Sequence, residues 1–289
     1  MNDLMALGAV QNVPLSSLTS MRVGGEAAFV LRISDEERFA SALAVCKASG
    51  LPCTLIGNGT NVLARDKGYS GLVLVFDKPH FEAEFNGTFV RASAGEQLTS
   101  LTKRCVKANL SGLERLCGIP GTVGGACAMN AGAYGGEIGD VLRRVRVFKD
   151  GAFCDIEVSS TDLGYRKSRF AYPECIVFEA VFELKEDEGT ARQVMEDCLK
   201  KRRSKQPLEY PSAGSTFKRP EGHFAGELIE RCGLKGARIG GASVSYKHAG
   251  FIINDKNASA DDVYKLIDYV QKTVFEKTGV LLEREVKDI

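Results

Sequence analysis

Glycine is concentrated in one part of this chain, and that concentration limits the backbone structures the segment can form. Eight of the 31 glycines fall within 22 residues, GIPGTVGGACAMNAGAYGGEIG, from Gly118 to Gly139. Glycine allows tight turns and a close approach of the backbone to a ligand, because it has no Cβ. We therefore expect a loop whose backbone lies against a bound group, and phosphate is the first candidate.

A second loop, Gly57-Asn-Gly-Thr-Asn61, separates a strand expected at Cys53–Ile56 from an apolar run at Leu72–Phe76. A Walker A loop is excluded because the chain has no Gly-Lys dipeptide. A Rossmann domain is unsupported, because Val62 replaces the third glycine of the dinucleotide fingerprint and no helix is expected there. One such loop alone would be a turn between strands. Two in one domain favour a large phosphate-bearing cofactor, since turns of this kind form anion-binding nests.

Charge and composition exclude several classes of partner. The chain has 38 basic and 37 acidic side chains, so neither nucleic acid nor an anionic membrane is an expected partner. The start, MNDLMALGAV, is not a signal peptide, and no later stretch could span a bilayer, so a cytoplasmic protein is expected. The nine cysteines contain no C-x-x-C and are expected to be reduced and mostly buried; a zinc site is not expected.

Helices and strands alternate irregularly, which indicates an α+β chain. Ser34–Glu37 resembles a capping box before a helix that ends at Gly50. The composition becomes acidic and loop-like near Glu186, where we place the main domain boundary. Further helices are expected at 96–108, 190–203, 225–232 and 259–277, and further strands at 145–149, 153–158, 176–184 and 280–286, the first two joined by the hairpin signal Asp150-Gly151.

Several motifs together carry a resemblance to a known family. Thr19-Ser-Met-Arg-Val-Gly-Gly25, Ile56–Leu63, Gly118–Gly125 and Asn130-Ala-Gly-Ala-Tyr134 resemble UDP-N-acetylenolpyruvoylglucosamine reductase, and the match continues through Tyr165–Ser168, Pro211–Lys218 and Leu282–Val286. The resemblance covers nearly the whole chain. Met21 replaces an aromatic residue usual in the family. No tyrosine-bearing insertion follows the Tyr-Arg motif, so the chain resembles the family's shorter form.

The resemblance implies a two-subdomain FAD-binding fold of the PCMH/vanillyl-alcohol-oxidase type, with a carboxy-terminal α+β substrate-binding domain. The expected FAD-binding subdomains are residues 1–70 and 71–187. Residues 188–289 would bind substrate, with the last strand returning toward the flavin. The implied activity is a bacterial, cytoplasmic one of cell-wall synthesis: with NADPH and non-covalent FAD, it reduces the enolpyruvyl ether of UDP-N-acetylglucosamine to the lactyl ether. A UDP-sugar is the implied small-molecule partner, and a monomer is expected.

The family motifs also imply which residues bind FAD. They lie in the first motif and in the two glycine loops, and the second loop continues along the flavin toward the reacting ring. The cofactor-binding candidates are Arg22, Gly24, Gly57, Asn58, Gly59, Thr60, Asn61, Gly118, Ile119, Pro120, Gly121, Thr122, Gly124, Gly125, Asn130, Gly132 and Ala133.

Three residues are candidates for catalysis. Reduction of a double bond conjugated to a carboxylate needs a stabiliser of the enediolate and a proton donor to the α carbon. By spacing alone, Arg166 belongs to a solvated basic turn, Ser215 to a rigid turn after Pro211, and Glu285 to a solvated strand face. The resemblance implies that Arg166 stabilises the carboxylate, that Ser215 donates the proton, and that Glu285 assists Arg166. A neighbour, Lys218 or a bound water, would help Ser215.

Candidates for substrate binding rest on weaker signals. The resemblance implies Tyr165 and Lys218. Lys205 and Arg219 could pair with UDP phosphates, although the basic run Lys200–Lys205 is also explained by the negative pole at the end of its helix. Two rivals stay open. One is a sugar oxidase of the same fold, many of which attach FAD through a histidine; His80, the only histidine before residue 200, lies outside both loops. The other is a non-catalytic flavin or nucleotide-sugar binding protein.

Overall fold

The computed structural model describes residues 2–289 and divides into two compact units. Unit 1 comprises the chain up to residue 9 together with residues 31–58 and 73–202. Unit 2 comprises residues 10–30, 59–72 and 203–289. The division falls between Asn58 and Gly59, within the first glycine loop.

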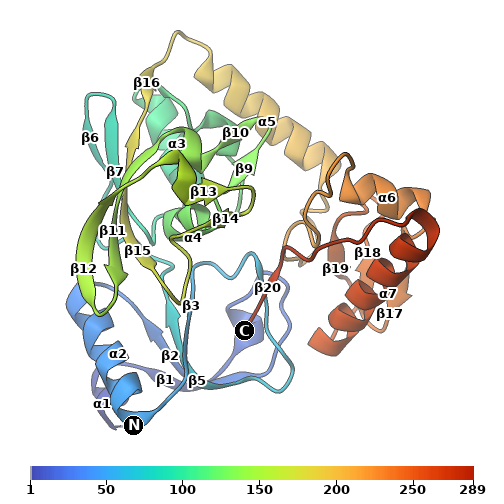
Figure 1. Ribbon diagram of the computed structural model, residues 1–289, viewed down its shortest axis with the longest axis horizontal. Helices are drawn as coiled ribbons and strands as arrows, with labels where there is room; N and C mark the ends of the chain where they lie inside the picture. The colour runs from blue at the N-terminus through green and yellow to red at the C-terminus, as the bar shows by residue number, and fades with distance from the viewer. Residues whose placement is uncertain (1) are drawn as a thin grey trace. The chain divides into compact units, whose positions relative to one another are not determined.

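Unit 1 is built on a five-stranded antiparallel sheet of order β12-β11-β15-β7-β6 (Figure 1). Along the inner strand β11, buried Val145 and Val147 alternate with the more exposed Arg144 and Arg146, as expected of a sheet with one covered face. Helix α4 packs on β15 and β7. The strands are β6 (Glu84–Asn86), β7 (Phe89–Ser93), β11 (Leu142–Lys149), β12 (Ala152–Glu157) and β15 (Ile176–Glu183), and the helices beside them are α3 (Leu98–Lys107) and α4 (Val123–Ala128).

A hairpin joins β11 and β12 as the sequence predicted. Asp150 and Gly151 both have positive φ, 52° and 85°, and Lys149 lies opposite Ala152. These angles match the type I′ turn that Asp-Gly favours between strands. An edge-to-face cluster of aromatic rings packs helix α2 (Glu36–Ser49) onto the sheet, with the Phe39 and Phe178 ring centroids 4.9 Å apart.

Helix α2 begins one residue later than the expected capping box. Asp35, not Ser34, is the N-cap, and its carboxylate accepts a hydrogen bond of 2.7 Å from the Arg38 N–H. Ser34 donates its hydroxyl hydrogen to Asp35 instead. A charged carboxylate is the stronger acceptor at the positive end of a helix, which explains the shift. The expected end at Gly50 is confirmed, with φ at 64°.

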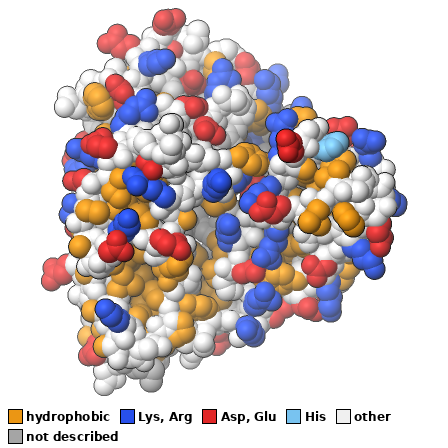
Figure 2. Space-filling view, viewed as in Figure 1, with side chains coloured by type: hydrophobic (Ala, Val, Ile, Leu, Met, Phe, Trp, Pro, Cys, Tyr) orange, Lys and Arg blue, Asp and Glu red, His pale blue; other side chains and the backbone are white. Residues whose placement is uncertain are grey.

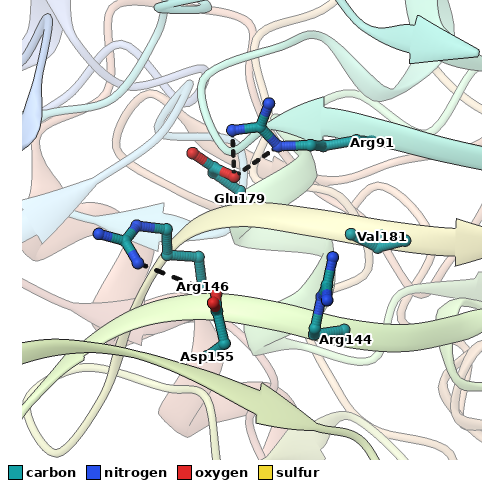
Figure 3. A pocket seen from close by; sticks show the side chains of 6 residues that line it. All are labelled: Arg91, Arg144, Arg146, Asp155, Glu179 and Val181. Carbon is teal, nitrogen blue, oxygen red and sulfur yellow. Dashed lines mark hydrogen bonds and ion pairs between the residues drawn. The ribbon is translucent and has the colours of Figure 1, made fainter.

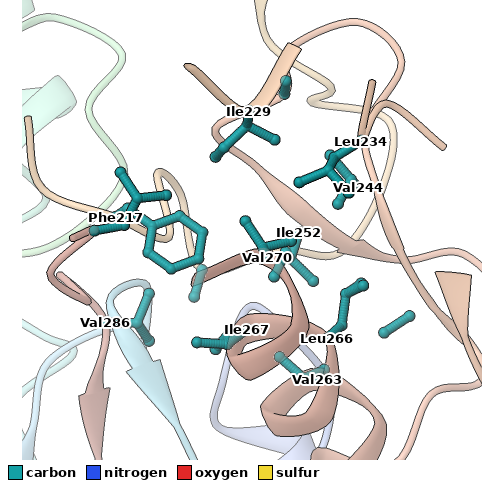
Figure 4. Packing of buried hydrophobic residues seen from close by; sticks show 14 of the residues in the cluster. Phe217, Ile229, Leu234, Val244, Ile252, Val263, Leu266, Ile267, Val270 and Val286 are labelled. Carbon is teal, nitrogen blue, oxygen red and sulfur yellow. The ribbon is translucent and has the colours of Figure 1, made fainter. Parts of the chain in front are cut away.

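Unit 2 has its core around the long helix α7 (Ala260–Thr278), which packs against a three-stranded sheet of order β17-β18-β19 (Figure 4). The expected capping box is confirmed, since Ser259 and Asp262 bind each other's backbone N–H groups. The buried face of α7 consists of Val263, Leu266, Ile267, Val270 and Val274, together with the helix's first residue. Its partners are α6 (Ala225–Arg231), β17 (Arg238–Ile239), β18 (Ala242–Val244) and β19 (Ile252–Asn254).

The expected strand at Val280–Val286 is wrong. Residues 280–283 have no regular structure, Arg284 forms a single antiparallel bridge with Phe217, and the terminal strand β20 is Lys287–Asp288. β20 pairs in parallel with β4 (Val62–Leu63), directly after the first glycine loop. The end of the chain does not form one long strand because its two parts pair with separate segments, Arg284 with Phe217 and β20 with β4.

The remaining elements are short or lie at the edges of the units. β1 and β2 form an antiparallel pair that the sequence analysis did not identify. β3 agrees with the prediction residue for residue and neighbours β5. Their bounds are α1 (Asn2–Ala6), β1 (Val10–Pro14), β2 (Glu26–Arg32), β3 (Cys53–Ile56), β5 (Tyr69–Val75), β8 (Leu110–Ser111), β9 (Gly132–Ala133), β10 (Gly136–Glu137), β13 (Leu163–Gly164), β14 (Lys167–Ser168), β16 (Lys185–Glu186) and α5 (Ala191–Lys205).

The cysteines and the surface agree with the composition. Seven of the nine free cysteines are buried, as expected. Burial raises the pKa of Cys127 in α4 to about 12, so its thiol stays protonated at neutral pH. Acidic and basic side chains are interspersed over the visible face (Figure 2). Among residues 2–289, no helix is both long enough and apolar enough to cross a membrane.

Candidate active site

Strained backbone marks the predicted site. Within residues 2–289, eight residues other than glycine have positive φ, and five of these are Asn or Asp, which tolerate that conformation. The other three are Arg22, Tyr134 and Arg166, with φ of 58°, 54° and 55°. All three lie in the motifs that carry the resemblance. Left-handed backbone costs about 1–2 kcal/mol for such residues, and strain of this kind gathers at functional sites.

The two glycine loops meet in unit 1. The segment before α3 forms backbone hydrogen bonds with the second loop, Val123 N–H to Glu96 O at 2.8 Å and Leu98 N–H to Gly121 O at 3.0 Å. A Cβ on Gly57 would lie 2.4 Å from Thr122 Oγ1. Gly57 does not have positive φ, so this close approach is the reason for glycine there.

Gln97 connects the loops, and the sequence analysis missed it. Its backbone is bridged to Thr122, and its side-chain amide exchanges hydrogen bonds with the amide of Asn58. Nothing in the local sequence singles out this glutamine, because the pairing joins residues 39 positions apart.

Arg166 lies at the tip of the β13–β14 hairpin, in the two-residue turn with Tyr165. It is half-buried, and its Nη2 donates a 3.0 Å hydrogen bond to the carbonyl of Gly132. Asn130 also holds the hairpin, since its Nδ2 donates to the carbonyl of Gly164 at 3.2 Å. The turn is therefore fixed against the second loop, unlike the freely solvated turn that spacing alone suggested.

Arg202 is a second residue that the sequence analysis did not single out. It lies near the end of α5 and is only 8% exposed, although it belongs to the basic run Lys200–Lys205. A Cβ on Gly118 would lie 3.1 Å from its Cδ, and its guanidinium carbon is 5.8 Å from the centroid of the Tyr134 ring. Burial lowers the pKa of Arg202. This arginine therefore lies beside the glycine-rich stretch at two points, Gly118 and Tyr134.

Unit 2 contains the rest of the first loop and the first motif. A Cβ on Gly59 would lie 2.1 Å from the carbonyl oxygen of Leu18, and one on Gly24 would lie 2.5 Å from Ala64 Cβ. The Ser20 N–H donates to Gly59 O at 3.0 Å, while its hydroxyl donates to Ser212 O at 2.6 Å. Ser20 thus connects the first loop to the segment that leads to Ser215.

The segments of Ser215 and Glu285 lie side by side. The Glu285 N–H donates to Thr216 O at 2.9 Å, and the Lys218 N–H donates to Glu283 O at 2.8 Å. The Lys287 N–H then donates to Asn61 O at 3.0 Å. Two catalytic candidates far apart in sequence are therefore neighbours, next to the first glycine loop.

The substrate-binding candidates have varied surroundings. Lys218 Nζ forms an ion pair with Glu283, whose pKa it lowers. The Arg219 guanidinium carbon stacks 4.0 Å from the centroid of Phe224. Lys205 is exposed at the end of α5, and Tyr165 is exposed beside Arg166.

A surface cavity of about 290 Å³ lies elsewhere, over the polar face of the five-stranded sheet (Figure 3). Arg91 contacts Glu179 at 2.7 Å, and Arg146 lies 4.0 Å from Asp155. These are cross-strand ion pairs of a solvated sheet face, and none of the candidates lines the cavity. Nearby, the Ser93 hydroxyl and His80 Nδ1 are 2.7 Å apart, so the imidazole of His80 is held outside both glycine loops.

Comparison with known proteins identifies the family. Two family models match: "FAD binding domain" over residues 27–153, and "UDP-N-acetylenolpyruvoylglucosamine reductase, C-terminal domain" over residues 206–289. UDP-N-acetylenolpyruvoylglucosamine reductase of Exiguobacterium sibiricum is 48% identical, over 96% of this chain and 92% of that protein. The Clostridium botulinum protein of that name is 46% identical over 96% and 90%.

A solved structure supports the same assignment. The crystal structure of UDP-N-acetylenolpyruvylglucosamine reductase (MurB) from Thermus caldophilus superposes with a TM-score of 0.82 at 36% identity, covering 96% of this chain and 98% of that one. Fold and sequence identity agree along nearly the whole chain. The chain therefore belongs to the UDP-N-acetylenolpyruvoylglucosamine reductase family.

Proposed function

We propose that this chain catalyses the reaction of its family, the reduction of UDP-N-acetylglucosamine enolpyruvate to UDP-N-acetylmuramate in peptidoglycan precursor synthesis. FAD is the cofactor and NADPH the reductant. The observation that carries the proposal is 48% identity to a named reductase over 96% of the chain.

The donor set and the backbone of the loops suit FAD. Gly57, Gly59 and Gly124 let the loops pack closely, because a Cβ at each would lie within 3.0 Å of a neighbouring protein atom. Tight glycine turns of this kind can direct successive backbone N–H groups at an anionic diphosphate. Gly57–Asn61 and Gly118–Gly125 would hold the diphosphate, and 130–133 would continue along the flavin, with Arg22 and Gly24 completing the set. Bound FAD supplies the hydride that NADPH delivers to it.

Three side chains perform the rest of the chemistry. Arg166, a permanent cation with a planar fork, binds the substrate carboxylate and stabilises the enediolate that forms on reduction. Ser215 gives the proton to the α carbon, and Glu285 assists Arg166 at the developing negative charge. The backbone pairing of residues 216 and 285 supports joint placement of the last two.

The role of Lys218 changes in view of its contacts. Its ammonium group is restrained by the ion pair with Glu283. A bound water is therefore the better relay for Ser215, and Lys218 serves the substrate. Tyr165, Lys205 and Arg219 complete the substrate set, with Arg202 as an additional cation beside the second loop.

We assign residues 1–70 and 71–187 to two FAD-binding subdomains and 188–289 to the substrate domain, whose last strand returns toward the flavin. The pairing of β20 with β4 supports that return. We further propose that the protein is a cytoplasmic monomer.

One experiment tests the function. The purified protein should show a visible flavin spectrum, and UDP-N-acetylglucosamine enolpyruvate should accelerate its oxidation of NADPH. If NADPH is lost at the same rate without that substrate, the proposed reaction is wrong. A covalently retained flavin after denaturation would instead favour the sugar oxidases.

A further inference from the structure

Gln97 lies at the start of helix α3, where a side chain ordinarily caps the free N–H groups of the first turn. It is the N-cap of α3, yet its side chain makes no capping hydrogen bond. Ser, Thr, Asp and Asn are the residues preferred at an N-cap, because their short side chains reach the free N–H groups of the first turn. The glutamine amide is directed elsewhere.

The partner of that amide is Asn58, in the first glycine loop. Asn58 Nδ2 donates to Gln97 Oε1, and Gln97 Nε2 donates to Asn58 Oδ1 at 2.9 Å. Both side chains are partly buried, so water competes weakly for these groups. Such a reciprocal pair fixes both amides in position and in orientation.

The backbone of Gln97 is held by the other loop. It is bridged to Thr122, and hydrogen bonds flank the bridge on both sides, from Val123 N–H to Glu96 O and from Leu98 N–H to Gly121 O. Gly57, next to Asn58, has no room for a Cβ because of Thr122 Oγ1. One residue thus fixes the spacing of two loops by its side chain and its backbone.

We propose that Gln97 is a positioning residue for FAD, which sets the two diphosphate-binding loops at the separation that the cofactor requires. The inference rests on the proposal that both loops bind the FAD diphosphate. Gln97 acts through Asn58 and Thr122 and need not touch the cofactor. Its side chain fixes the spacing of the loops and does not cap helix α3.

The contrast between loop positioning and helix capping provides a test. Gln97→Ser supplies a preferred N-cap and removes the link to Asn58. The melting temperature of the variant's apoprotein should be unchanged or higher. FAD should bind about ten-fold more weakly, as expected when hydrogen bonds that hold a loop are lost. FAD affinity is measured by diluting the holoenzyme and following the gain in flavin fluorescence as the cofactor dissociates.

One further variant makes the result specific. Gln193→Ser is the matched control. Gln193 is an exposed helical glutamine of α5 whose amide donates to Asp197 at 3.1 Å, and its loss should leave FAD binding unchanged.

Gly57→Ala separates failure of this inference from failure of the loop assignment. If Gly57→Ala releases FAD and Gln97→Ser does not, Gln97 is not a positioning residue, although the loops still bind the cofactor. If neither substitution changes FAD affinity, the assignment of the loops fails and the inference fails with it. A Gln97→Ser variant that loses both FAD affinity and the thermal stability of its apoprotein also overturns the positioning role.

Discussion

Ser215 is held by the pairing of its segment with the chain end near Glu285, and its hydroxyl has one proposed task. Ser215→Ala removes the proton donor without disturbing the glycine loops. The variant should keep reduction of its flavin by NADPH near normal, while reoxidation by the enolpyruvyl substrate falls at least about 100-fold, as for loss of a general acid. Stopped-flow absorbance of the flavin measures the two half-reactions separately.

Ser70→Ala is the control, because Ser70 is an exposed serine of the same unit. It should leave both half-reactions unchanged. If Ser215→Ala slowed both half-reactions equally, Ser215 would have a structural role and a different proton donor would be needed.

Two glycines with nearly the same backbone angle separate strain from crowding. Gly59 and Gly87 have φ of 61° and 57°. A Cβ on Gly59 would lie 2.1 Å from Leu18 O, whereas nothing lies within 4 Å of one on Gly87. Gly87→Ala should cost about 1 kcal/mol of unfolding free energy through its left-handed backbone alone. Gly59→Ala should cost at least about twice as much and should release FAD.

Urea unfolding measures the unfolding free energy of the two variants, and flavin fluorescence measures the release of FAD. Equal losses of stability would mean that the backbone at Gly59 moves away from Leu18 without cost, and the tight first loop would then not be required.

Among the elements of the fold, the start of α7 contains a carboxylate whose contacts predict how the stability of the protein depends on pH. Asp262 accepts hydrogen bonds from the N–H groups of Gly241 at 3.1 Å and Ser259 at 3.0 Å, and these bonds lower its pKa. A carboxylate with a lowered pKa in the folded state stabilises the fold above about pH 4, the value expected for the unfolded chain. That stabilisation is lost as pH falls through the lower, folded pKa.

Asp262→Asn should therefore lose stability near neutral pH and show a weaker decrease of melting temperature between about pH 4 and pH 2 than the parent protein. Asp261→Asn, in the same helical turn, is the control, since the Asp261 carboxylate forms an ion pair of 2.5 Å with the exposed Lys265. Acid melting curves that are parallel for Asp262→Asn and the parent would contradict the capping role of the carboxylate.

Elements governed by local sequence could be predicted. The Asp150-Gly151 hairpin, β3 and α7 follow from turn chemistry, alternation and capping, and all three are confirmed. The chain end could not be predicted, because its strand length depends on partners at Phe217 and Val62, far away in sequence. Helix α4 was missed because two glycines in VGGACA mask a helical turn that Thr122 caps.

The candidate site shows the same division. The glycine loops, Arg166, Ser215 and Glu285 are candidates because they lie in the motifs that carry the resemblance. Gln97 and Arg202 have ordinary local sequence, and only the folded backbone brings them to Asn58 and Gly118. Long-range pairing of this kind has no signal in a single sequence.

For the whole molecule, the loops and the cofactor together predict how stability depends on ligand. A ligand that binds only the folded chain stabilises it by an amount that grows with the logarithm of free ligand, about 4 kcal/mol at 1,000 times the dissociation constant. Removal of FAD should therefore lower the melting temperature, and the melting temperature of the apoprotein should rise with added FAD.

The part of FAD that gives this stabilisation distinguishes the proposed site from other flavin sites. If the backbone of Gly57–Asn61 and Gly118–Gly125 binds the diphosphate, riboflavin, which has no phosphate, should stabilise the apoprotein far less than FAD at the same concentration. ADP, which has the diphosphate but no flavin, should raise the melting temperature by an intermediate amount. Thermal melts of the apoprotein with each compound test this order. Riboflavin that stabilised the apoprotein as strongly as FAD would place the binding energy at the isoalloxazine ring, and the glycine loops would then need another explanation.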